Sequence, residues 1–141
     1  MGTLYVVGTP IGNLGDLSPR AREVLGTVGL VVAEDTRVSR VLLDRLGIAT
    51  PRLSFHRHST EARRREIVER LAEADVALIS DAGTPSISDP GAALVADARA
   101  AGHHVVAVPG ASAVTAALSI SGMPADRYLF LGFLPRRGAD R

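Results

Sequence analysis

The sequence contains no cysteine and no lysine, and each absence excludes a class of chemistry. Without cysteine there can be no disulfide, no thiolate metal site and no cysteine nucleophile. All sixteen basic residues are arginine, so a Schiff-base lysine and the lysine of a Walker A phosphate loop are also excluded. The formal net charge of +1 does not by itself indicate a nucleic-acid partner.

Long apolar runs are scarce as well. None approaches the roughly twenty residues that a membrane-spanning helix requires, and the N-terminus lacks the basic region of a signal peptide. We therefore expect a cytoplasmic protein with no membrane partner. A length of 141 residues with 46% hydrophobic content is enough for one domain with a buried core.

Short apolar runs alternate with helical patterns along the chain. The runs are nearly continuous in apolar character, which is typical of strands buried on both faces of a parallel sheet. They cover residues 4–7, 30–34, 53–55, 76–80 and 104–108. The sequence therefore predicts an α/β fold with a mainly parallel sheet flanked by helices.

Five helices are expected around these strands. Their capping and stop signals predict helices over 18–28, 36–47, 60–74, 89–102 and 112–122. In the second helix, Thr36 is the expected cap, and four apolar residues are expected to face the core: Val38, Val41, Leu42 and Leu46.

The segment "YLFLGFLP" (128–135) holds three of the chain's five aromatic residues. We interpret it as a strand, and such an apolar strand has to be covered by something. We expect a first domain over 1–124 and a linker over 125–141 that leads to a further domain, or a second subunit that covers this strand.

Unusual residues follow every predicted strand. The segments after the five strands are "GTPIGNLGD", "EDTR", "HRHST", "SDAGTP" and "PGASA". The carboxyl ends of parallel strands meet at one edge of the sheet, where ligands bind. We therefore expect these loops to share one site.

Two of these loops are rich in glycine. Gly8, Gly12 and Gly15 could form a phosphate loop, because glycine lets backbone N–H groups approach an anion. Their spacing matches neither a dinucleotide-binding loop nor a Walker A loop, so a tight turn remains an alternative. "SDAGTP" is either a solvent-facing turn or a bare backbone surface for a ligand. In the second case Asp81 would accept from a ribose hydroxyl or an amine.

The remaining loops carry ionisable side chains. Glu34 and Asp35 beside an arginine could supply a general base or a substrate clamp, or they could simply stabilise a helix N-terminus. His56 and His58 lack a third ligand, so we expect no metal site. The arginines of 57–65 form either a solvated helix face or a contact with RNA phosphates.

Together, "LYVVGTPIGNLGDLSPRA", "VVAEDTR", "LISDAGTPSISDPG", "VPGASAVTAAL" and "GFLPRR", in this order and spacing, resemble the ribosomal RNA small subunit methyltransferase I family of the tetrapyrrole methylase superfamily. The resemblance covers essentially the whole chain, and "SDAGTPSISDPG" is its most specific part. It implies S-adenosylmethionine-dependent methylation of the ribose 2′-hydroxyl of a cytidine in the decoding region of small-subunit (16S) ribosomal RNA. It also implies that the protein forms a homodimer and that its partner is small ribosomal subunit RNA.

The resemblance further implies two α/β domains with the cofactor in the cleft between them. Carried over by motif, the residues that touch the cofactor are Pro10, Asp81, Thr84, Ser112 and Ala113. Three glycines are expected to act through backbone shape: Gly8, Gly83 and Gly110. The chain departs from the family at His58-Ser59-Thr60, where the family often has His-Asn-Glu.

The sulfonium of the cofactor already activates the methyl group, so no metal is required. The protein has to align the ribose oxygen and accept its proton. Our candidate for the base, or for orienting the hydroxyl, is Asp35, with Arg37 and Arg40 on phosphate. Another methylase of the superfamily and a non-catalytic RNA-binding or self-associating fragment are the alternatives, and we expect the isolated chain to be weakly active or inactive.

Overall fold

The computed structural model describes residues 1–88 and 90–134. Five strands form one sheet in the order β3-β2-β4-β1-β5, and every neighbouring pair is parallel. The strands are β1 (Thr3–Val7), β2 (Leu30–Ala33), β3 (Arg52–Ser54), β4 (Val76–Ile79) and β5 (His104–Val108). The predicted α/β fold with a parallel sheet is confirmed.

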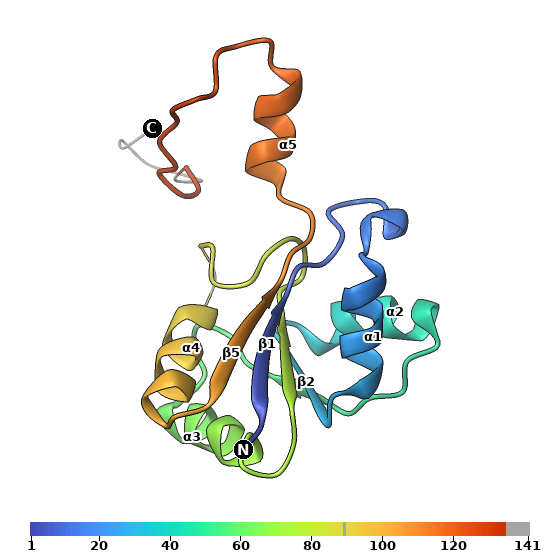
Figure 1. The fold of residues 1–141 in the computed structure, drawn as a ribbon, viewed down its shortest axis with the longest axis vertical. Coiled ribbons are helices and arrows are strands. Elements are labelled where there is room, and N and C mark those ends of the chain that lie inside the picture. Colours follow the sequence, from blue (N-terminus) through green and yellow to red (C-terminus); the bar gives the residue numbers. More distant parts are fainter. Residues whose placement is uncertain (89, 135–141) are drawn as a thin grey trace.

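Helices cover both faces of this sheet (Figure 1). The helices are η1 (Leu14–Asp16), α1 (Pro19–Thr27), α2 (Thr36–Leu46), α3 (Glu61–Arg70), α4 (Gly91–Ala100) and α5 (Ala113–Ile120). Leu25 of α1 and Leu43 of α2 belong to the core on one face. Ile67 of α3 and Leu94 of α4 belong to the core on the other face.

The helices that follow β1 and β4 lie on opposite faces of the sheet. β1 and β4 are hydrogen-bonded neighbours, but β1 leads to α1 on one face and β4 leads to α4 on the other. In open parallel sheets such a divergence leaves a crevice beyond the carboxyl ends of the strands, and ligands bind there. The strand order therefore places the candidate site above β1 and β4.

The helix starts follow local capping chemistry. The Ser18 hydroxyl accepts the Ala21 N–H at 3.0 Å, and Pro19 occupies the first turn, so the predicted start of α1 is confirmed. Thr60 caps α3 in the same way. The cap of α2 is Asp35 and not the predicted Thr36.

The predicted core face of α2 is wrong for two of its four residues. Val38 and Val41 are 43% and 54% exposed, whereas Ser39 and Leu43 are buried. Apolar spacing identifies an apolar stripe, but it does not say whether the stripe faces the core or a cleft. Strand burial differs from expectation too, because β3 and β5 lie at the edges of the sheet and stay partly exposed.

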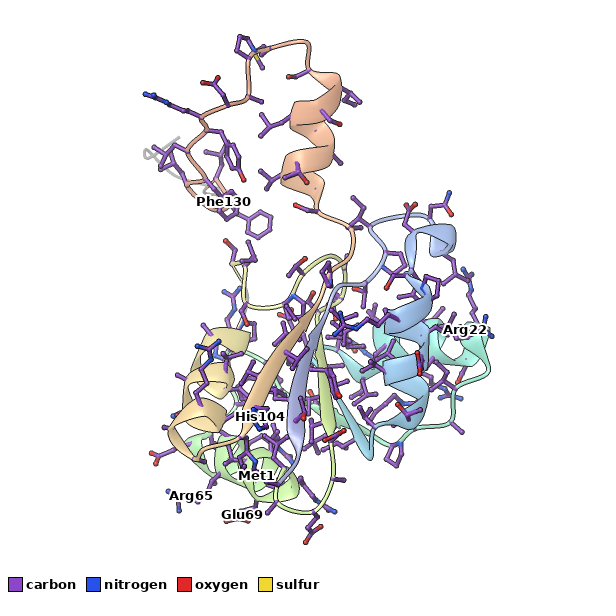
Figure 2. The ribbon with its side chains drawn as sticks, in the orientation of Figure 1. Met1, Arg22, Arg65, Glu69, His104 and Phe130 are labelled. Carbon is purple, nitrogen blue, oxygen red and sulfur yellow. The ribbon has the colours of Figure 1, made fainter. Side chains whose placement is uncertain are left out.

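The chain after β5 leaves the sheet. α5 projects beyond the carboxyl ends of the strands and has no buried residue, and Phe130 lies on the segment that follows it (Figures 1 and 2). The strand predicted over 128–135 is wrong for 128–134, which form no regular element. Pro135 and the rest of the predicted linker, and Asp89 at the predicted start of the fourth helix, lie outside the described residues.

Candidate functional site

Two glycines bring the loops after β1 and β5 into direct contact. The Gly8 N–H donates to the Val108 carbonyl at 2.9 Å. A Cβ built on Gly8 would lie 2.7 Å from the Cα and N atoms of Gly110, and one on Gly110 would lie 2.8 Å from Gly8. Only bare backbone fits at this contact, as expected for residues that act through backbone shape.

The loops after β1 and β4 are joined by backbone hydrogen bonds. Thr9 and Gly83 exchange N–H···O bonds of 2.9 and 3.1 Å, and the buried Thr9 hydroxyl donates weakly to the Ser80 and Gly83 carbonyls at 3.4 and 3.3 Å. Gly83 has a φ of +80°, which favours glycine. A Cβ there would lie 3.6 Å from the Ile11 side chain and 3.8 Å from the Ala111 carbonyl oxygen. Three of the predicted loops therefore meet in one place.

The loop that contains Asp81 also contacts the start of α2. The Asp35 N–H donates to Asp81 Oδ1 at 3.1 Å. The Asp35 Oδ1 atom in turn accepts the Arg37 N–H at 2.8 Å, which caps α2. The Arg37 guanidinium binds both carboxylate oxygens of Asp35, at 3.1 and 2.8 Å. The site thus contains a continuous chain of contacts from Asp81 to Arg37.

These contacts set the charge state of Asp35. Hydrogen bonds from the Arg37 side chain and backbone lower the pKa of Asp35 from 3.8 to about 2, and the same contact raises the pKa of Arg37. Asp35 is therefore ionised at neutral pH. A carboxylate whose pKa is this low and whose oxygens are already occupied is a weak proton acceptor.

A cleft of about 660 Å³ lies between the β1–α1 loop and α2; we call it the α2 cleft. It is lined by Thr9, Pro10, Gly12, Asn13, Leu14, Asp35, Arg37, Val38, Val41, Leu42, Arg45 and Asp81. Five of these residues form one stripe along α2: Arg37, Val38, Val41, Leu42 and Arg45. Arg40 lies on another face of α2 and pairs with Asp44 at 3.5 Å.

Arg45 is the lining residue that the sequence did not single out. It stands four residues after Val41 and eight after Arg37, so one α2 face presents all three to the α2 cleft. This i, i+4, i+8 spacing was the available signal. It was overlooked because a basic residue in the last turn of a helix is common for electrostatic reasons alone.

A second hollow, of about 620 Å³, lies on the other side of the β1–α1 loop; we call it the α5 hollow. It is lined by Ile11, Asp16, Ala111, Ser112, Thr115, Ala116 and Ser119. Of the residues expected to touch the cofactor, Pro10 and Asp81 line the α2 cleft, and Ser112 lines the α5 hollow. Ala113 begins α5, and Thr84 directly follows Gly83.

The candidate histidines and the arginines of α3 line neither the α2 cleft nor the α5 hollow. The rings of His56 and His58 are 6.1 Å apart, and the described residues form no cluster of three potential metal ligands. Arg63, Arg64 and Arg65 each pair with a carboxylate, at 2.7, 2.7 and 3.1 Å. These pairs favour the solvated helix face over an RNA contact.

No described helix is long and apolar enough to cross a membrane.

Comparison with known sequences identifies the family. The sequence model of the tetrapyrrole (corrin/porphyrin) methylases matches residues 3–137. The chain belongs to this family.

Individual relatives of the chain carry a narrower name. "Ribosomal RNA small subunit methyltransferase I" from Xylella fastidiosa (strain Temecula1) is 55% identical over 99% of this chain and 52% of its own length. The protein of that name from Synechocystis sp. PCC 6803 is 51% identical over 100% of the chain and 51% of its own length. The predicted resemblance is confirmed, and the chain spans about half the length of the curated relatives it matches.

Two solved structures share the fold. Uroporphyrin-III-C-methyltransferase from Thermus thermophilus superposes with a TM-score of 0.66 at 26% identity, over 88% of this chain and 53% of its own. Diphthine synthase gives a TM-score of 0.69 at 19% identity, over 88% of this chain and 50% of its own, which shows the fold alone.

Proposed function

We propose that this tetrapyrrole methylase chain serves S-adenosylmethionine-dependent methylation of small-subunit ribosomal RNA, with the ribose 2′-hydroxyl of a decoding-region cytidine as the methyl acceptor. The observation that carries the proposal is the meeting of the loops at Gly8, Gly83 and Gly110 above the diverging strands. The name of the relatives supports an RNA substrate. Such a protein acts in the cytoplasm, where small ribosomal subunits are found.

The loops fit a nucleoside cofactor. The contact of Gly8 with Gly110 leaves no room for a Cβ, and the exposed Gly110 offers a ligand a surface without a side chain. Asp81 keeps a carboxylate oxygen for a ribose hydroxyl, since the Asp35 N–H bonds only to Oδ1. Pro10, Thr84, Ser112 and Ala113 lie on the same loops and would complete the contacts.

When bound, S-adenosylmethionine would supply an activated methyl group to the ribose oxygen, with S-adenosylhomocysteine as the other product and the hydroxyl proton released to water. The residues of this chain have to hold the ribose in line and exclude competing water. The low pKa of Asp35 argues against this residue as the base. We propose instead that Asp35 orients Arg37 and, through it, the acceptor strand, while Arg40 makes at most a peripheral phosphate contact because it lies outside the cleft.

The exposed apolar residues after β5 support the proposal that further protein covers this region. Ile120, Leu129, Leu131 and Phe133 are each at least 80% exposed. Apolar surface of this extent marks an interaction site. We propose that a further domain after residues 125–141 and a homodimer partner cover it and complete the cofactor cleft, so that the isolated chain transfers methyl groups weakly or not at all.

The deciding experiment is the transfer of labelled methyl from S-adenosylmethionine to methyl-free small ribosomal subunits, followed by nucleoside analysis. The chain is compared with a version extended by the proposed further domain. Label on a cytidine ribose, with the extended version far more active, supports the proposal.

Other outcomes contradict separate parts of it. Label on a base would overturn the 2′-hydroxyl assignment but not the RNA substrate. Cofactor binding without transfer to RNA would favour a different acceptor within the family, such as a tetrapyrrole or a protein side chain. Robust turnover by the chain alone would overturn the proposed role of the further domain.

A further inference from the structure

α2 presents three chemically different faces. Ser39 and Leu43 are buried against the sheet, and Arg40 and Asp44 pair with each other in solvent. The third face, which looks into the α2 cleft, consists of Arg37, Val38, Val41, Leu42 and Arg45. An apolar stripe with a cation at each end is thus left uncovered by the rest of the described chain.

The two hollows beside the β1–α1 loop differ in charge. The α2 cleft is lined by two arginines, Arg37 and Arg45, and by two carboxylates, Asp35 and Asp81. Arg37 is paired with Asp35, whereas Arg45 forms no ion pair with a described residue, and Arg22 of α1, labelled in Figure 2, lines an adjoining hollow together with Arg45. The described residues that line the α5 hollow include Asp16 and no arginine. An RNA strand carries one negative charge per nucleotide, so the end of the α2 cleft at Arg45 suits a phosphate, whereas the described residues of the α5 hollow offer no cation.

We propose that the α2 cleft receives the nucleotide whose ribose is methylated, with its base against Val38 and Val41 and a flanking phosphate on Arg45. This inference rests on the proposed function and deepens it by assigning the substrate to one side of the β1–α1 loop. The cofactor then lies toward Gly83 and Ser112, and Pro10 and Asp81, which both line the α2 cleft, stand at the border between the two ligands.

The dimensions and chemistry of the cleft suit one nucleotide. Its volume of about 660 Å³ lies within the range of small-ligand sites, which are mostly apolar with a few placed polar groups. The aliphatic side chains offer a surface for the flat face of a base. Arg37 is held by Asp35, whereas Arg45 has no carboxylate partner among the described residues, so its full charge is available to a phosphate.

The test is direct binding, which requires no turnover. The chain extended by the proposed further domain is labelled on valine methyl groups and titrated with cytidine 5′-monophosphate in millimolar excess, with and without S-adenosylhomocysteine. We expect the signals of Val38 and Val41 to shift with the nucleotide and to remain nucleotide-sensitive when S-adenosylhomocysteine is bound.

Two substitutions and a matched control sharpen the test. Arg45→Ala is expected to weaken binding of the nucleotide about tenfold, and Val41→Glu, which places a carboxylate on the exposed stripe, should weaken it at least as much. Arg99→Ala removes the same charge from α4, on the opposite face of the sheet, and should leave binding unchanged. With a short cytidine-containing RNA, Arg45→Ala should also reduce the salt slope of binding by about 1.

Three results would overturn the inference. The first is that the valine signals do not shift with excess nucleotide, and the second is that Arg45→Ala and Arg99→Ala have the same effect on binding. The third is that S-adenosylhomocysteine alone shifts the same signals and displaces the nucleotide, which would make the α2 cleft the cofactor site. None of these results decides whether RNA is methylated. That question belongs to the transfer assay, so the two proposals fail separately.

Discussion

The backbone of Gly8 lies directly against the backbone of Gly110, and no side-chain atom fits between them. This contact joins the loops after β1 and β5, which are neighbours in the sheet although about a hundred residues separate them in the chain. It holds the two loops at backbone-to-backbone distance.

Gly8→Ala is therefore expected to destabilise the protein by about 1–3 kcal/mol, because the added methyl group would sit 2.7 Å from Gly110 and force the loops apart. It should also weaken binding of S-adenosylhomocysteine. Urea unfolding and calorimetric titration measure the two effects. Gly110→Ala should behave in the same way, since the clash is mutual.

Gly26→Ala is the matched control for this prediction. A Cβ at Gly26 meets nothing within 4 Å, and Gly26 lies inside α1. Alanine there should raise the free energy of unfolding by about 0.5–1 kcal/mol through helix propensity. If Gly8→Ala were as harmless as Gly26→Ala, the close approach of the two loops would not constrain the site.

A second prediction concerns the contact between Asp81 and Asp35. Asp81→Ala removes the acceptor of the Asp35 N–H and, under the proposed function, a cofactor contact. We expect the amide resonance of Asp35 to move and S-adenosylhomocysteine to bind about tenfold more weakly, as for the loss of a charged hydrogen bond.

Asp81→Asn separates these two roles. The asparagine side chain keeps a carbonyl oxygen that can accept the Asp35 N–H, so the Asp35 resonance should return close to its original position. Cofactor affinity should recover only in part, because the negative charge is lost. Full recovery of affinity would mean that Asp81 acts through α2 alone.

The third prediction follows from the pKa of Asp35. A carboxylate whose folded pKa is lowered stabilises the folded state above its unfolded pKa, and this contribution is lost as the pH falls through the folded pKa. For Asp35 the window runs from about 3.8 down to about 2. NMR titration of the side-chain carboxyl signal should place its midpoint near 2.

Arg37→Ala tests the cause of that shift. It removes the side-chain hydrogen bonds that are the largest contribution, so the pKa of Asp35 should rise back toward 3.8. A midpoint that stayed near 2 in this variant would assign the shift to backbone hydrogen bonds. In neither protein should Asp35 change charge between pH 5 and 8, so any pH dependence of methyl transfer there must arise from another group.

The fold followed from the sequence where local chemistry decides structure. Strand runs and the Ser18–Pro19 start of α1 were predicted because apolar periodicity and caps act over a few residues. Strand order is different, because it depends on how distant segments pair. The contacts of Gly8 with Gly110 and of Thr9 with Gly83 follow from that order, so the sequence indicated a shared edge but not which loops touch.

The errors have a common physical origin. Val38 and Val41 are apolar at helical spacing, and the same spacing serves a core face or a ligand cleft. The apolar segment over 128–134 has strand-like composition, but a strand needs a hydrogen-bonding neighbour, and the described part of the chain provides none there. In both places the composition identifies the apolar residues but does not identify what covers them.

The faces of α2 give the last prediction. Leu43 is fully buried against the sheet, so Leu43→Ala should lower the free energy of unfolding by about 2–5 kcal/mol. Val41→Ala removes a side chain from the cleft face only and should change it by less than about 0.5 kcal/mol. Urea unfolding of the two variants measures the difference. If Val41→Ala proved as costly as Leu43→Ala, the stripe would be part of the core after all, and the α2 cleft would not be open to a nucleotide.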